Sequence, residues 1–126
     1  MGEDIAEKYL EGKGFTIVTR NYRKKFGEID VVAKKDGRIH FVEVKTVSCE
    51  KLPESAKRES DSKNDLFRPE DNVHSWKLKR LSRVIQVYLS DKKIDDETDW
   101  QFDVITIFLD EKNKEAKVSV LSDLVL

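Results

Sequence analysis

Three charged side chains lie inside two segments that otherwise have the apolar, β-branched composition of buried strands. Asp30 is in GEIDVVAKK, and Glu43 and Lys45 are in RIHFVEVKTV. Residues two apart in a strand point to the same face, so Glu43 and Lys45 share a face. If the segments pair around a turn at Asp36 and Gly37, Asp30 and Glu43 become cross-strand neighbours whose carboxylates repel. A divalent cation would relieve that repulsion.

Mg²⁺ takes oxygen ligands in octahedral geometry, and proteins typically bind it through one or two carboxylates, water and substrate phosphate. Lys45 would lie near a metal-bound water, where it could orient or help deprotonate that water, or neutralise charge on a phosphate under attack. The three residues therefore predict a site that hydrolyses phosphodiesters. The alternative is a solvent-facing ion pair between Glu43 and Lys45, with Glu28 and Asp30 equally exposed, because surface ion pairs are common and weak.

The hydrophobic pattern predicts the elements that must position these residues. GEDIAEKYLEGKGF has apolar residues at helical spacing and ends in glycines, which predicts a short amphipathic helix. FTIVTRNYR is rich in β-branched and aromatic residues and predicts the first strand, and the two charged segments predict a hairpin after it. In the first strand of that hairpin, alternation predicts one face with Glu28, Asp30 and Val32 and another with Ile29, Val31 and Ala33.

A second helix is predicted in NVHSWKLKRLSRVIQVYLSDKK, where one face is apolar. That face consists of Leu78, Leu81, Ile85 and Tyr88. DWQFDVITIFLD and AKVSVLSDLVL follow it as strands. The resulting order αβββαββ predicts an α/β fold, with a sheet of about five strands flanked by helices.

The length of 126 residues is that of one domain, so residues 1–126 are expected to form a single domain. Residues 48–71 have few apolar residues and no period, and we interpret them as a mobile loop. Cys49 is the only cysteine, which rules out a disulfide within the chain. No apolar run approaches the roughly 20 residues of a membrane-spanning helix, and the N-terminus is acidic, so we expect a cytoplasmic protein without a membrane partner.

Net charge gives no support for nucleic-acid binding, because 24 Lys and Arg residues nearly cancel 25 Asp and Glu residues. The cations nevertheless gather in RNYRKK and on the second predicted helix, as Arg20, Arg23, Lys24, Lys25, Lys77, Lys79, Arg80 and Arg83. Either group could bind phosphates or form an ordinary solvated surface, and a metal site nearby favours phosphate binding. His40 and His74 have no motif partner, so we interpret them as surface or strand-filling residues.

An ordered set of motifs extends beyond the three charged residues and covers nearly the whole chain. It consists of GED in the first helix, GF and TRNYR, GEID, FVEVKT, the lysine-rich helix and FDVITI. In this order the motifs resemble the YraN family of predicted endonucleases, within the restriction-endonuclease-like PD-(D/E)xK superfamily, whose relatives in fold include archaeal Holliday junction resolvases. The resemblance implies a nuclease-like core built on a central mixed sheet.

The resemblance also implies roles for individual residues. Asp30 and Glu43, with the backbone carbonyl of Val44, would bind Mg²⁺ or Mn²⁺, and Lys45 would serve the attacking water. Glu3 matches the helix glutamate of the family and would add a ligand through water. These residues, together with Glu28, are the catalytic candidates. Glu28 would support Asp30 or bind a second metal ion, or it is an exposed strand carboxylate without such a role.

The expected function is a metal-dependent endonuclease that hydrolyses DNA, with branched or structured DNA as a candidate substrate and no small-molecule cofactor. One alternative is a nucleic-acid-binding module of the same fold without catalysis, and another is a protein-interaction domain that uses residues 48–71. This segment departs from the shorter loop, richer in Gly and Arg, of the family, which leaves the substrate open. Two-fold substrates such as junctions would suit a homodimer.

Overall fold

The computed structural model describes residues 2–25, 27–48 and 72–124, except for the side chains of residues 72–77. Its helices and strands follow the predicted order. They are α1 (Gly2–Gly12), β1 (Thr16–Lys24), β2 (Gly27–Lys35), β3 (Arg38–Ser48), α3 (Asn72–Asp91), β4 (Trp100–Asp110) and β5 (Glu115–Leu121). The loop predicted over residues 48–71 lies outside the described residues, apart from Ser48, which ends β3.

The described strands form one mixed sheet in the order β1-β2-β3-β4-β5. Neighbouring strands are antiparallel except for β3 and β4, which are parallel. A parallel pair needs a crossover connection, and α3 lies within this one. The predicted α/β fold, a five-stranded mixed sheet with flanking helices, is therefore confirmed for the described part of the chain.

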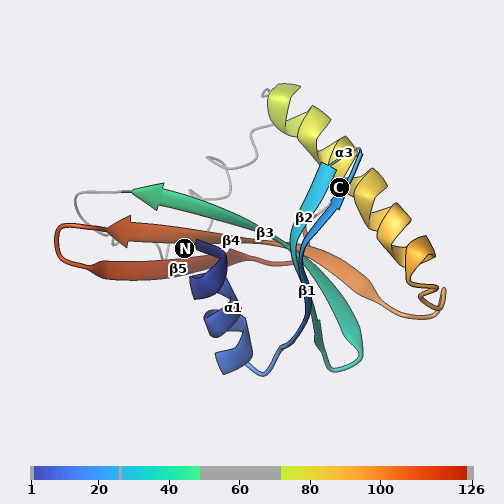
Figure 1. The fold of residues 1–126 in the computed structure, drawn as a ribbon, viewed down its shortest axis with the longest axis horizontal. Coiled ribbons are helices and arrows are strands. Elements are labelled where there is room, and N and C mark those ends of the chain that lie inside the picture. Colours follow the sequence, from blue (N-terminus) through green and yellow to red (C-terminus); the bar gives the residue numbers. More distant parts are fainter. Residues whose placement is uncertain (1, 26, 49–71, 125–126) are drawn as a thin grey trace.

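The helices pack on opposite faces of the sheet, and Figure 1 shows the strands between them. The α3 core joins the predicted apolar face of this helix to the sheet, through Leu81, Val84, Ile85, Tyr88, Phe41, Phe102 and Val104. The α1 core is smaller and contains Ala6, Leu10, Val31, Val42, Ile105 and Ile107. Because β3 lies between the two cores, its successive side chains face different helices.

Strands β2 and β3 separate beyond Val31. Their ladder ends at the pair Val31 and Val42, and Figure 1 shows β2 extending beside α3 while the end of β3 runs away from it. Val31 and Ala33 belong to the α1 core. Ile29 and Val32 belong to the α3 core. The predicted common face of Ile29 and Val31 is therefore wrong, because β2 turns towards α3 after it leaves the ladder.

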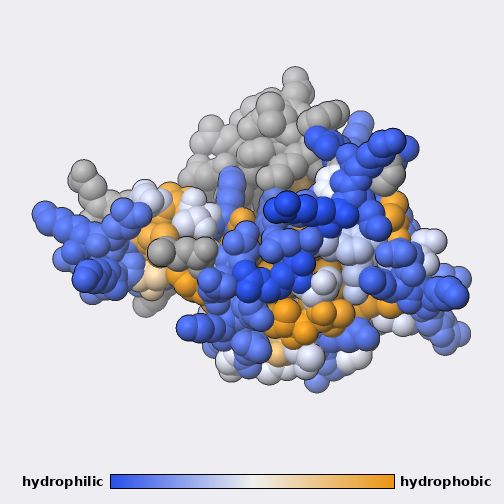
Figure 2. Space-filling view, in the orientation of Figure 1, coloured by the Kyte–Doolittle hydropathy of each residue, from blue (hydrophilic) through white to orange (hydrophobic). Residues whose placement is uncertain are grey.

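Polar side chains cover much of one face of the described residues. The face in Figure 2 is largely hydrophilic, with small apolar areas between charged side chains. Among the described residues, the exposed large hydrophobic side chains are Val18 and Val47. No helix in the described ranges is long and apolar enough to cross a membrane.

Gly27 begins β2 at a close approach to α3. Its φ is 157°, and a Cβ built on it would lie 3.2 Å from Val84 Cγ2. Side-chain-bearing residues rarely adopt this backbone region, and it costs them about 1–3 kcal/mol. Glycine therefore allows β2 to enter the α3 core at this point.

We expect Gly27→Ala to lower the free energy of unfolding by about 1–3 kcal/mol, because it adds backbone strain and a tight contact with Val84. Gly12→Ala is the matched control, since a Cβ at the end of α1 would meet no atom within 4 Å. Urea denaturation measures both variants. Equal stability of the two would show that the approach of β2 to α3 does not require glycine.

Candidate metal site and nucleic-acid interface

Asp30 lies where the ladder between β2 and β3 stops. Its carboxylate is half-buried, and Oδ2 accepts a hydrogen bond of 2.8 Å from the backbone N–H of Val44. In a strand the N–H and the C=O of one residue point to the same side. The carbonyl of Val44 therefore also faces β2, which brings two of the predicted metal ligands to one edge of β3.

The pKa of Asp30 is raised to about 6. Burial is the largest cause, a hydrogen bond with Glu28 and the negative charges of Glu43 and Glu28 add to it, and the Val44 N–H opposes it. Continuing the register beyond Val31 and Val42 would place Asp30 opposite Glu43. The structure thus brings together the carboxylates whose repulsion the spacing predicted.

Glu43 and Lys45 project to the α3 side of the sheet. Their neighbours on β4 are Val104 and Thr106, and Val104 belongs to the α3 core. Both charged side chains are half-buried.

Glu3 and Glu28, the other two predicted catalytic residues, lie in different parts of the fold. The first turn of α1 packs on β3, since a Cβ on Gly2 would collide with Thr46 Oγ1 and contact Val44 Cγ1 at 3.7 Å. This contact brings Glu3 near the end of β3 from the α1 side. Glu28 is exposed and forms an ion pair with Arg23.

The donor set suits a hard divalent cation. Two carboxylates and one backbone carbonyl are oxygen ligands, as Mg²⁺ and Mn²⁺ prefer, and water and substrate phosphate would complete the coordination. Across residues 2–25, 27–48 and 72–124, no group of three or more Asp, Glu, His or Cys side chains is placed to hold a metal ion. Of the predicted ligands, Asp30 and Glu43 contribute side chains and Val44 contributes its backbone carbonyl. No third side chain joins them to form such a group among these residues.

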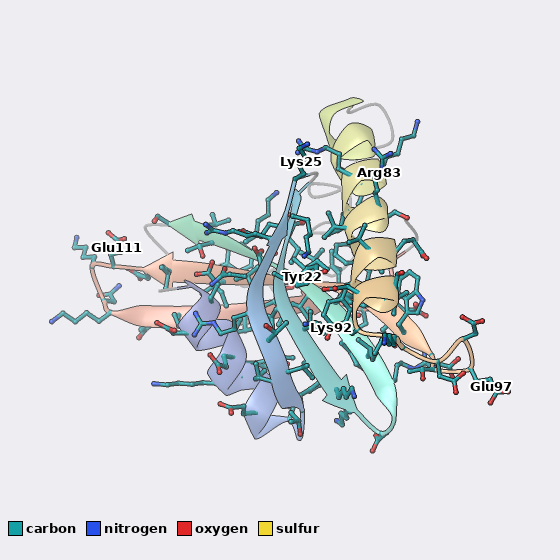
Figure 3. The ribbon with its side chains drawn as sticks, turned by 45° about the vertical axis from the view of Figure 1, so that its right-hand side comes forward. Tyr22, Lys25, Arg83, Lys92, Glu97 and Glu111 are labelled. Carbon is teal, nitrogen blue, oxygen red and sulfur yellow. The ribbon has the colours of Figure 1, made fainter. Side chains whose placement is uncertain are left out.

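The two basic segments meet in a groove between β1 and α3. Lys24 and Lys25 line it from the end of β1, and Arg83 lines it from α3, around a volume of about 560 Å³. Figure 3 shows Lys25 and Arg83 on these neighbouring elements. Asp91 lies at the groove too, with Oδ2 3.9 Å from Lys24 Nζ. Tertiary structure thus joins cations that are far apart in the sequence.

Other predicted phosphate-binding cations face acidic side chains. Arg20 Nη1 lies 3.0 Å from Asp4 Oδ1 and 2.8 Å from Glu7 Oε2, so this side chain ties β1 to α1. Arg23 is paired with Glu28 across the β1–β2 ladder. The remaining predicted cations on α3 are Lys79 and Arg80, which are exposed, and Lys77, whose side chain lies outside the described residues.

His40 has a partner that the sequence did not reveal. Its Nδ1 lies 2.7 Å from Asp103 Oδ2, and both side chains are buried on the α1 side of the sheet. The residues are 63 positions apart and meet only because β3 and β4 pair in parallel. His40 is therefore a buried residue that fills β3, and its partner Asp103 is one that no sequence motif marks. The Asp inside the apolar run FDVITI was the available signal, since a buried carboxylate needs hydrogen-bond donors.

The chain matches the model of the uncharacterised protein family UPF0102 over residues 2–107. A UPF0102 protein of Campylobacter hominis is 37% identical over 124 residues, which cover 98% of this chain and 89% of the relative. A UPF0102 protein of Caldicellulosiruptor bescii is 31% identical over 122 residues, which cover 97% and 91%. One from Campylobacter fetus is 36% identical over 113 residues, which cover 90% and 82%.

We expect Asp30→Asn to stabilise the metal-free protein above pH 6. The folded-state pKa of Asp30 is raised from 3.8 to about 6, so its favourable contribution to stability is complete below about pH 4 and is lost as the pH rises through 6. Because Asp30 is only half-buried, we expect a gain of about 1 kcal/mol, or about 3–5 °C in melting temperature.

Thermal melts in EDTA across the range from about pH 4 to pH 8 measure this effect. The advantage of asparagine should grow up to pH 6 and then level off. Asp96→Asn, at an exposed carboxylate, is the matched control. A variant that is no more stable than the wild type at pH 8 would contradict the electrostatic conflict at Asp30.

Proposed function

The chain belongs to the uncharacterised protein family UPF0102, and for this member we propose the activity of a metal-dependent endonuclease that hydrolyses DNA. The observation that carries the proposal is the position of Asp30. A strand carboxylate is held by the Val44 N–H beside Glu43, although burial and the neighbouring charge both disfavour its ionised form. Strongly perturbed carboxylates next to a specific charge partner are typical of functional sites.

A divalent cation gives this arrangement a physical reason. Asp30, Glu43 and the carbonyl of Val44 would hold Mg²⁺ or Mn²⁺. Such an ion, when bound, polarises a phosphoryl oxygen and lowers the pKa of a bound water. Lys45 lies two residues after Glu43 on the same face, so its ammonium would neutralise charge on the phosphate and orient the attacking water. The positions of these residues in the fold support the proposed roles.

The groove between β1 and α3 would guide the phosphate backbone to this site. Lys24 and Lys25 precede Gly27, where β2 begins against α3. Asp30 is three residues further on, about 10 Å along the strand at roughly 3.3 Å per residue. Phosphate contacts of this kind position a nucleic acid without reading its sequence. We therefore propose DNA in general as the substrate. Branched or structured DNA is a more specific candidate, because the motifs resemble a family related in fold to junction resolvases.

A nucleic-acid-binding module without catalysis is the second candidate. It is favoured by one observation: among the described residues, no group of three or more Asp, Glu, His or Cys side chains is placed to hold a metal ion. Such a module would bind DNA through the same groove and would not cleave it. Cleavage and binding must therefore be measured separately.

We expect Asp30→Asn and Lys45→Met each to reduce Mg²⁺- or Mn²⁺-dependent cleavage of DNA at least about 100-fold, since the first removes the charge of a metal ligand and the second removes the cation beside the reacting phosphate. The substrates are single-stranded, duplex and four-way-junction DNA, assayed on gels. Matched controls are Glu115→Gln and Lys117→Met, exposed residues of β5.

Wild-type cleavage by the Asp30 and Lys45 variants would refute this site. Saturable binding by the wild type, with no cleavage of any substrate in either metal, would instead support the non-catalytic module.

We expect the double variant Lys25→Gln/Arg83→Gln to weaken DNA binding and to reduce the slope of log K against log[salt] by about 2, because each lost phosphate contact removes about 1. Fluorescence anisotropy at several salt concentrations measures this slope in EDTA. Lys112→Gln/Lys114→Gln is the matched control in the turn between β4 and β5, which carries the Glu111 labelled in Figure 3. An equal loss in both double variants would mean that the groove has no special role.

A further inference from the structure

A second cavity lies on the face of the sheet opposite to Glu43 and Lys45. It has a volume of about 360 Å³ and is lined by residues of α1, the segment that follows it, and strands β2 to β5. The residues that matter for its chemistry are Tyr9, Lys13, Phe15, Lys35, His40 and Asp103. A volume near the lower end of the range for ligand pockets, about 300–1,000 Å³, suits a small molecule rather than a polymer.

The floor of this cavity holds the pair formed by His40 and Asp103, whose side chains are only 11% and 6% exposed. Asp103 Oδ1 accepts hydrogen bonds from Gln101 Nε2 at 2.8 Å and from the backbone N–H of Asp123 at 2.9 Å. Its Oδ2 lies 2.7 Å from His40 Nδ1. Because a carboxylate oxygen accepts hydrogen bonds, we assign the His40 proton to Nδ1, from which it is donated to Asp103 Oδ2.

This assignment leaves Nε2 of His40 available to a ligand. Within the described residues His40 has no other hydrogen bond, and its ring lines the cavity. Phe15 packs edge-on against the imidazole, with ring centroids 4.7 Å apart. The ring is therefore held in position by Asp103 and Phe15, and a polar group fixed in this way confers orientation and specificity on a binding site.

Two ammonium groups lie at the same cavity. Lys35 Nζ donates a hydrogen bond of 2.7 Å to the carbonyl of Lys13 and lies 5.1 Å from the centre of the Phe15 ring. Lys13 Nζ lies 5.6 Å from the centre of the Tyr9 ring. The cavity thus combines aromatic faces with two cations, the features that recognise a planar ring and an anionic group.

We propose that this cavity binds a nucleoside monophosphate, with the phosphate held by Lys13 and Lys35, the base against Tyr9 and Phe15, and a polar group of the ligand on His40 Nε2. The base and the phosphate match the aromatic and cationic halves of the cavity. The site does not use Asp30, Glu43 or a divalent cation. It is independent of the proposed nuclease activity.

Calorimetry and NMR titration of the full chain in EDTA test this proposal with nucleoside 5′-monophosphates as the probes. Saturable binding is expected, with inorganic phosphate and unphosphorylated nucleosides each at least about tenfold weaker, since each retains only part of the contacts. Inorganic phosphate that binds as tightly as the nucleotides, or no binding of any nucleotide at millimolar concentration, would overturn it.

Lysine variants test whether the nucleotide binds in the cavity or elsewhere on the surface. Lys13→Gln/Lys35→Gln should weaken binding at least about tenfold, because two charge-assisted contacts are lost. Lys34→Gln, at an exposed lysine of the same strand that does not line the cavity, should leave binding unchanged. If Lys34→Gln weakened binding equally, the nucleotide would be bound by general surface charge and not by this cavity, and the proposal would be refuted.

His40→Asn tests the imidazole itself. An asparagine amide retains a donor for Asp103 and removes Nε2, so binding should fall while the circular dichroism spectrum stays that of the wild type. Asp30→Asn should bind the nucleotide as the wild type does. Loss of binding in Asp30→Asn would show that the ligand occupies the proposed metal site instead of this cavity.

Discussion

The candidate site depends on the hydrogen bond from the Val44 N–H to the carboxylate of Asp30. The ladder between β2 and β3 has ended one step earlier, at Val31 and Val42. A backbone donor at the end of a ladder must find another acceptor, and the Asp30 side chain supplies it. The strands can therefore separate without leaving this N–H unsatisfied, and a carboxylate is drawn in beside Glu43.

The separation of β2 from β3 organises the rest of the molecule. Once free of the ladder, β2 turns towards α3, where Ile29 enters the α3 core and Gly27 allows the close contact with Val84. The same contact brings the cations at the end of β1 next to Arg83. Strand β3 lies between the α1 core and the α3 core, so its alternate side chains point to opposite faces of the sheet. Glu43 and Lys45 face the α3 side, and His40 faces the cavity beside α1.

Local patterns predicted most of the fold and part of the site. The order of helices and strands followed from period and composition, and the apolar face of α3 from helical spacing, because these depend on near neighbours in the chain. The shared face of Glu43 and Lys45 followed from alternation for the same reason. Alternation failed at Ile29, where β2 leaves its partner and the contacts with α3 set the orientation of the side chain.

By itself the sequence determined that Asp30, Glu43 and Lys45 would lie on adjacent strands, since the turn at Asp36 and Gly37 sets the register between them. Only the tertiary structure decided which long-range partners each charge would meet. The parallel pairing of β3 with β4 joined His40 to Asp103, and the packing of α1 on β1 placed Asp4 and Glu7 against Arg20. Such contacts depend on how elements pack across the sheet, and no periodicity within a single segment records that packing.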